Sequence, residues 1–127
     1  MVGGRIRLME DGRPIFLQIA ELIENSIIDG TLAEEAQVPS TNELAAFHRI
    51  NPATAGKGVN QLVDEGTLYK KRGIGMFVAT GARAKLRDRR REDFAQQFLH
   101  PLLAEANKLG IDADELKRMI DRWEQGR

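Results

Sequence analysis

Residues Pro39 to Gly66 read PSTNELAAFHRINPATAGKGVNQLVDEG, a stretch with two short helical patterns separated by a few residues. In the first pattern, Ser40 and Glu43 have the spacing of a capping box, in which each side chain accepts a hydrogen bond from the backbone N–H of the other residue. Such a box satisfies donors that the first helical turn otherwise leaves unpaired. A helix is therefore expected to begin at Thr41.

The second pattern opens with Asn51 and Pro52. Asparagine is a good N-cap, and proline suits the first helical position because its φ is already helical and its missing N–H would have no partner there. Gly66 is expected to end this helix, since glycine tolerates the left-handed backbone at a helix C-terminus. Two helices joined by so short a turn are typical of a helix-turn-helix, whose second helix reads DNA.

A hairpin is expected directly after the second helix. Residues 67–70 and 76–79 are rich in strand-forming side chains, and they flank a basic loop, residues 71–75, that contains two glycines. Glycine allows the positive φ of a tight reversal. A hairpin in this place is a wing, so residues 1–80 are expected to form a winged helix-turn-helix domain in a mainly α-helical chain.

The net charge of zero hides an uneven distribution along the chain. Residues 39–91 carry 11 basic and 4 acidic side chains, whereas residues 1–38 and 92–127 each carry an acidic excess. Phosphate neutralisation is local, so the basic excess indicates where a DNA duplex would bind. The basic run at residues 83–91 is more typical of a solvated helix, and whether it also contacts DNA is left open.

Composition argues against several other classes of protein. With 127 residues and no cysteine, the chain is expected to form one domain, or one with a small appendage, without disulfides or thiolate zinc sites. It has no apolar run long enough to cross a membrane and no signal-peptide core, so a cytoplasmic location is expected. His48 and His100 are far apart and lack acidic partners at metal-ligand spacing. No catalysis, metal or cofactor is expected.

Residues 14–29 are expected to form a helix ahead of the helix-turn-helix, with a broad apolar face turned to the core. Its apolar residues are Ile15, Phe16, Ile19, Ala20, Leu22, Ile23 and Ile27. Residues 1–13 are expected to form an arm or a short edge strand around Ile6 and Leu8.

Residues 81–127 are expected to form a separate segment of two helices. Apolar residues recur at steps of three and four from Phe94 to Leu109. Pro101 removes a backbone donor within that pattern and must kink or interrupt the helix. Asp112 and Glu115 have the spacing of a second capping box, which predicts the start of the final helix.

These two helices are too small to cover each other's apolar faces. The side chains left exposed on a monomer would be Phe94, Phe98, Leu102 and Trp123. Such a patch favours a two-fold homodimer, which would present paired recognition helices to a two-fold DNA site. The alternative is that the segment packs back onto residues 14–29 of its own chain.

Four spaced motifs occur in a characteristic order along the chain. They are Pro14-Ile15-Phe16-Leu17-Gln18-Ile19 with Gly30, Pro39-Ser40-x-x-Glu43-Leu44-Ala45, Asn51-Pro52-x-Thr54, and Gly73-x-Gly75-x-Phe77-Val78. Together they resemble the GntR family of bacterial winged-helix transcription regulators, and the short helical tail is similar to that of the YtrA subfamily. The resemblance implies a dimeric DNA-binding regulator, usually a repressor of its own operon and of neighbouring transport genes.

Helix geometry selects the residues expected to touch DNA. Thr54 and Lys57 are expected to enter the groove, with Ala53 against a thymine methyl group. Helix N-termini and the turn suit phosphate, and the basic wing tip suits phosphate or the minor groove. The phosphate set is Ser40, Thr41, Arg49 and Asn51, and the wing set is Lys71, Arg72 and Gly73. Helix capping alone is an equal alternative for Ser40 and also accounts for Asn51.

Glycines at positions 56 and 58 are unfavourable in a helix interior. Gly58 is expected to pack closely against the helix that begins at Thr41. Gly56 either lets the DNA backbone approach or is simply tolerated.

A protein-interaction module whose winged domain no longer binds DNA is the competing hypothesis. It is favoured slightly by the neutral net charge, by Asn42, where many family members have arginine, and by Ile74, where a basic residue often stands. Any effector is expected to be small and to bind in the dimer interface near Phe94, Phe98 and Trp123, or else to be absent.

Overall fold

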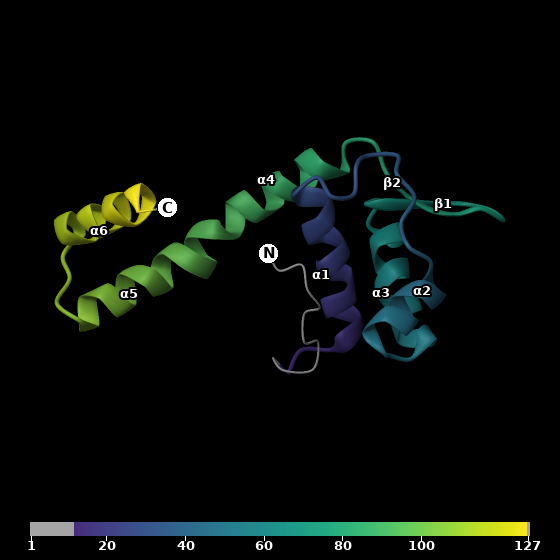
Figure 1. Ribbon diagram of the computed structural model, residues 1–127, viewed down its shortest axis with the longest axis horizontal. Coiled ribbons are helices and arrows are strands. Elements are labelled where there is room, and N and C mark those ends of the chain that lie inside the picture. Colours follow the sequence, from purple (N-terminus) through teal and green to yellow (C-terminus); the bar gives the residue numbers. More distant parts are fainter. Residues whose placement is uncertain (1–11, 127) are drawn as a thin grey trace. The chain divides into compact units, whose positions relative to one another are not determined.

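The computed structural model describes residues 12–126 (Figure 1). The arm or strand expected around Ile6 and Leu8 lies outside these described residues. The elements in chain order are α1 (Ile15–Ile28), α2 (Thr41–His48), α3 (Pro52–Asp64), β1 (Leu68–Lys71), β2 (Gly75–Val78), α4 (Ala82–Phe94), the π-helix η1 (Ala95–Leu99), α5 (His100–Lys108) and α6 (Ala113–Gln125). A mainly helical chain with one antiparallel hairpin is therefore confirmed.

The caps of the helix-turn-helix form as the sequence predicts. The Glu43 N–H donates to Ser40 Oγ at 3.0 Å, and the Ser40 N–H donates to Glu43 Oε1 at 2.8 Å, which completes the capping box of α2. Asn51 Oδ1 accepts from the Ala53 N–H at 2.7 Å and caps α3. Between these helices Arg49 adopts a left-handed conformation with φ 57°, which allows the chain to turn within a few residues.

Helix α3 packs against both α1 and α2, and β1 continues from it. The core of this unit is made by one face of α1, one face of α3, the base of the wing and the start of α4. Its buried members are Ile19, Ala20, Ile23, Ile27, Val38, Val59, Leu62, Leu68, Val78, Ala82 and Leu86. The apolar stripe predicted for residues 14–29 is therefore confirmed in its central positions, whereas Phe16 is only half-buried.

Gly58 marks the closest approach of α3 to α1. A Cβ atom at this position would lie 2.6 Å from the Phe16 carbonyl oxygen and 3.1 Å from the Ile19 side chain. The expectation that Gly58 packs against α2 is therefore wrong, because the helix that needs the space is α1. Gly56 is the glycine that faces α2, where a Cβ would meet Thr41 Cγ2 at 3.5 Å.

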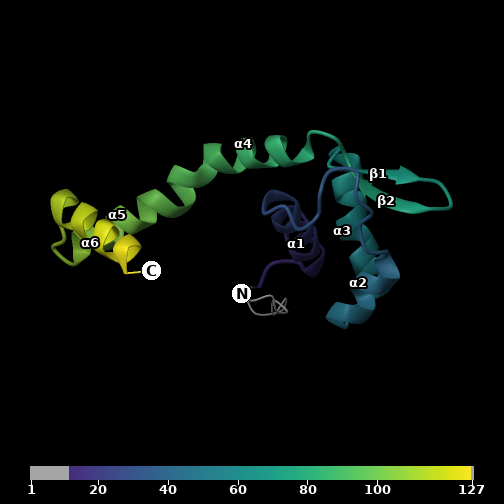
Figure 2. The same ribbon diagram turned by 45° about the horizontal axis from the view of Figure 1, so that its top comes forward.

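The wing is a two-stranded antiparallel sheet in which Leu68 pairs with Val78 and Lys71 with Gly75. Figure 2 shows the hairpin extending away from the helices of its own unit. An isolated bridge between Gln37 and Phe77 connects it to the segment before α2. The hairpin predicted from the two glycines is therefore confirmed, and its inner end is attached to the core through Leu68 and Val78.

The chain divides into two compact units, and the boundary lies between Arg87 and Asp88, within α4. The division falls later than the expected boundary after residue 80, because Ala82 and Leu86 on the first turns of α4 are buried in the core of the winged unit. In the second unit, the α5–α6 connection is closed by the Ile111 N–H, which donates to the Ala106 carbonyl at 2.9 Å. Asp112 caps α6 by accepting from the Glu115 N–H at 2.8 Å.

The interruption predicted at Pro101 takes the form of a π-helical turn. In η1 the His100 N–H donates to the carbonyl of Ala95, five residues earlier, and α-helix then resumes. A regular α-helix would bring the proline ring against the carbonyl four residues before it. The wider π-turn relieves that clash, and the helix continues through α5.

Replacing Gly58 with alanine tests the close approach of α1 and α3. We expect Gly58→Ala to lower the free energy of unfolding by about 1–3 kcal/mol, because the new methyl group overpacks the helix contact. The matched control is Gly56→Ala, which has room and should raise that free energy by up to about 1 kcal/mol through helix propensity. Urea unfolding curves measure both. Equal stabilities for the two variants would contradict the packing described.

Candidate nucleic-acid interface

The face of α3 that points away from the core carries the expected base-reading residues. Ala53 and Lys57 are exposed, and Thr54 is half-buried. Asn60, on the same face, is exposed as well. The opposite face, with Ala55, Gly58, Val59 and Leu62, is buried. The expected groove residues Ala53 and Lys57 are therefore accessible to solvent, and Thr54 is partly accessible. Gln61 Nε2 donates to Glu65 Oε2 at 3.3 Å, so this amide already has a partner.

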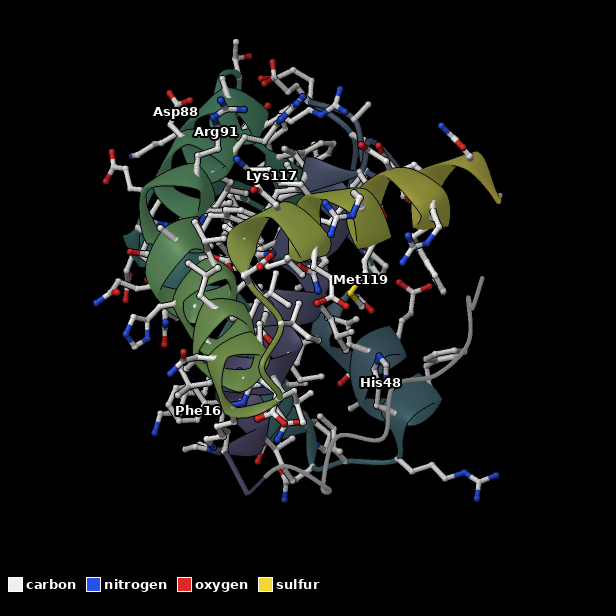
Figure 3. All side chains as sticks on the ribbon, turned by 90° about the vertical axis from the view of Figure 1, so that its left-hand side faces the viewer. Phe16, His48, Asp88, Arg91, Lys117 and Met119 are labelled. Atoms are coloured by element: carbon white, nitrogen blue, oxygen red, sulfur yellow. The ribbon has the colours of Figure 1, made fainter. Side chains whose placement is uncertain are left out.

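Lys57 does not extend freely into solvent. Its Nζ lies 4.1 Å from the centroid of the Phe16 ring. Phe16 is on the first turn of α1 (Figure 3). Both residues line a recess of about 550 Å³ on the outer side of α3. The recess is lined by Phe16, Ala53, Gly56, Lys57, Asn60, Gln61 and Asp64.

The residues predicted to bind phosphate surround the N-terminal ends of α2 and α3. Ser40 Oγ accepts the capping hydrogen bond from Glu43, which leaves its hydroxyl proton as a donor. Asn51 uses Oδ1 for its cap, and its amide N–H groups are separate donors. Thr41 is at the first position of α2, and Arg49 is exposed in the turn. Capping and phosphate binding are thus compatible for both capping residues.

At the wing, the positive charge lies over aromatic rings. Lys71 Nζ is 4.3 Å from the centroid of the Phe77 ring, and Tyr69 stacks on Phe77 with ring centroids 5.9 Å apart. Arg72 and Gly73 are exposed at the tip, where Gly73 has φ 76°. The wing therefore presents a lysine that its own aromatic side chains hold in place, beside an exposed arginine.

A brace of polar contacts fixes the wing to the segment between α1 and α2. Glu35 has a left-handed backbone with φ 68°, and its carboxylate accepts hydrogen bonds from the hydroxyls of Tyr69 and Thr80. Nearer the tip, Gln37 Nε2 donates to the Ile74 carbonyl at 3.1 Å. Sequence reasoning missed these residues, because each partner lies more than thirty positions away and no local pattern connects them.

The hydrogen bonds of this brace shift the pKa values of Glu35 and Tyr69. The hydroxyl of Thr80, followed by that of Tyr69, stabilises the charged carboxylate and holds the pKa of Glu35 below its ordinary value of 4.5. The same carboxylate raises the pKa of Tyr69 above its ordinary value. The Glu35 contribution to stability is therefore complete above pH 4.5 and is lost as the pH falls through the lower folded pKa.

The basic run at the start of α4 contains a structural contact. Arg83 Nε donates to the Ile28 carbonyl at 2.9 Å, at the C-terminal end of α1. The negative end of the α1 helix dipole stabilises a cation at this place. Arg83 therefore fixes the first turn of α4 to α1, a role that sequence reasoning did not assign.

The second unit exposes most of its large apolar side chains. Phe94, Phe98 and Trp123 are 57%, 62% and 74% exposed, and Leu102 is 44% exposed. Between residues 88 and 126, Ala106 is the apolar side chain that is buried. On α6, Met119 is another exposed apolar side chain, and Lys117 lies on the same helix (Figure 3). The predicted interface residues therefore lie on the surface, uncovered by their own unit.

No helix among residues 12–126 is long and apolar enough to cross a membrane. Over the same residues, no three histidine, cysteine, aspartate or glutamate side chains gather as a metal site. His48 instead makes an edge-to-face contact with Phe47, with ring centroids 4.9 Å apart.

Comparison with known proteins points to one family. The family model described as bacterial regulatory proteins, gntR family, matches residues 16–78. A crystal structure from Bacteroides thetaiotaomicron assigned to the GntR family of transcriptional regulators is 33% identical, with a TM-score of 0.68 over 87% of this chain and 96% of that one. The repressor YtrA of Bacillus subtilis is 27% identical over 84% of this chain and 82% of its own length. The AraR DNA-binding domain in complex with operator ORX1 is 30% identical, with a TM-score of 0.52 over 62% of this chain and 93% of that one.

The brace makes a testable prediction about titration. Thr80→Val and Tyr69→Phe should each raise the pKa of Glu35 toward 4.5, the former by more, because each removes a donor to the carboxylate. Titration of the Glu35 carboxyl carbon by NMR measures this. The pKa of Glu43, which the Ser40 backbone N–H lowers, serves as the internal control and should not move. An unchanged Glu35 pKa in both variants would show that the brace does not exist in solution.

Proposed function

The chain belongs to the GntR family of bacterial regulatory proteins, and from this premise we propose that it is a homodimeric repressor that binds a two-fold symmetric operator in duplex DNA. The observation that carries the proposal is the joint exposure, in one compact unit, of the N-terminal half of α3 and a basic wing. A bacterial regulator of this kind works in the cytoplasm, where the chromosome lies.

The proposed DNA contacts divide into base reading and backbone positioning. Thr54 and Lys57 enter the major groove, with Ala53 against a thymine methyl group. The groups around the N-termini of α2 and α3 bind phosphates, which fix the register of α3 on the duplex. They are Ser40, Thr41, Arg49 and Asn51. At the wing, Lys71, Arg72 and Gly73 bind phosphate or the adjacent minor groove. The operator complex of the AraR domain supports a DNA-binding role for this fold.

The proposed dimer forms through residues 88–126. The side chains that support this dimer are exposed in the single chain, and exposed apolar patches mark association surfaces. They are Phe94, Phe98, Leu102 and Trp123. A two-fold pairing buries the same face on both copies and needs no second kind of surface. It also gives the protein two recognition helices, which suit an operator with two equivalent half-sites.

The repressor role is extended from a relative, and the regulated genes are those that the family resemblance implies. YtrA of Bacillus subtilis, which this chain matches over most of both lengths, is a transcriptional repressor. We extend that role to this protein and propose that it represses its own operon and neighbouring transport genes. The intact turn, Lys57 and the basic wing favour this role over a protein-interaction module without DNA binding. No effector and no catalytic step form part of the proposal.

Two substitutions separate the DNA-binding half of the proposal from the dimer half. The probe is a duplex that the wild-type protein selects from a random pool, and the assays are fluorescence anisotropy and light scattering after gel filtration. Lys57→Ala should weaken specific binding by roughly 5- to 150-fold, the loss of one good base contact, and leave the dimer intact. Phe98→Asp should give a monomer, because it places a charge in the apolar face.

Salt dependence distinguishes a DNA-binding surface from an apolar protein interface. If the protein binds DNA through phosphates, the logarithm of its binding constant should fall steeply and linearly with the logarithm of the salt concentration. Selection of no duplex at low salt would contradict the DNA-binding proposal. A Phe98→Asp variant that is still a dimer would contradict the proposed dimer interface, whether or not the variant binds DNA.

A further inference from the structure

We propose that Phe16, on α1, is a positioning residue of the DNA-binding surface, because its ring holds the ammonium group of Lys57 beside the N-terminal half of α3. The inference rests on the proposed DNA-binding function and names a residue outside the helix-turn-helix and the wing. Phe16 is half-buried, so one part of its ring packs on the protein while another meets the lysine.

The contact has the geometry of a cation–π interaction. Lys57 Nζ lies 4.1 Å from the ring centroid, well inside the distance of about 6 Å at which the ring quadrupole attracts a cation. A free lysine side chain samples many rotamers, and ordering it on binding costs conformational entropy. A ring that already selects some of these rotamers reduces that cost when the ammonium group meets DNA.

Backbone packing explains why the two side chains meet. At Gly58 a Cβ atom would lie 2.6 Å from the Phe16 carbonyl oxygen, so the first turn of α1 is in contact with α3 at this point. Lys57 precedes Gly58 directly, and its side chain leaves α3 beside that contact. The meeting of Phe16 and Lys57 is therefore a consequence of how α1 and α3 pack.

The surroundings show which end of the recess suits DNA. Among the described residues that line it, Lys57 alone carries a positive charge, and Asp64 carries a negative charge near the C-terminal end of α3. Ala53 and Gly56 add almost no side-chain bulk, so the space beside Lys57 stays open. A duplex is attracted to the Lys57 end and repelled from the Asp64 end, which agrees with reading by the N-terminal half of α3.

A double-mutant cycle tests whether Phe16 acts through Lys57. On the duplex selected by the wild-type protein, Phe16→Leu should weaken binding by about two- to five-fold, the range expected for a cation–π contact at an exposed site. In a Lys57→Met background, the same change should have no further effect, because the ammonium group is already gone. Phe16→Tyr keeps a ring and should bind like the wild type.

A purely structural role for Phe16 gives a different result. Phe16→Leu would then weaken binding equally in the wild-type and Lys57→Met backgrounds, in parallel with a loss of thermal stability. That outcome overturns the proposal, as does normal binding by Phe16→Leu in the wild-type background.

A measurement without DNA separates this proposal from the proposed function. The ring current of Phe16 should shift the ε-CH₂ protons of Lys57 upfield in the NMR spectrum of the free protein, and Phe16→Leu should abolish the shift. An unshifted signal in the wild-type protein overturns the contact itself. A shifted signal in a protein that selects no duplex overturns the DNA-binding function, and with it the role of Phe16 in DNA binding.

Discussion

The close packing of α1 against α3 at Gly58 is the constraint on which the rest of the winged unit depends. Because position 58 has no side chain, the α3 backbone there lies close to both the Phe16 carbonyl and the Ile19 side chain, which is fully buried in the core. This contact decides which face of α3 turns inward and which stays in solvent. It also places Phe16 beside Lys57, so one glycine affects both the stability of the core and the arrangement of charge on its surface.

The two compact units differ in how much of their apolar surface they leave exposed. The winged unit buries most of its large apolar side chains in one core, although Phe47 and Ile74 are exposed, and it leaves Lys57, Lys71 and Arg72 accessible to solvent. The second unit leaves aromatic side chains such as Phe98 and Trp123 in solvent instead. A net charge of zero is the sum of these different parts and says little about either. The proposed binding to a polyanion and the proposed self-association thus fall on separate stretches of one short chain.

Local signals in the sequence predicted the local structure well. The Ser40–Glu43 box, the Asn51–Pro52 start of α3 and the glycine-containing hairpin all depend on residues within a few positions of one another, and the structure confirms them. Contacts between distant residues could not be read in the same way. The partner of Gly58 and the Glu35 brace depend on which elements pack together, and that is decided by the whole core. The candidate contacts with DNA and with a second copy stay predictions, argued from exposure and charge.

The most direct test of the central claim is hydroxyl-radical footprinting on a duplex selected by the wild-type protein. Two copies joined by their C-terminal helices should protect two equivalent segments, related by two-fold symmetry, with centres about one helical turn of DNA or a whole multiple of it apart. A single protected segment at saturating protein, with no symmetric counterpart, would contradict the claim.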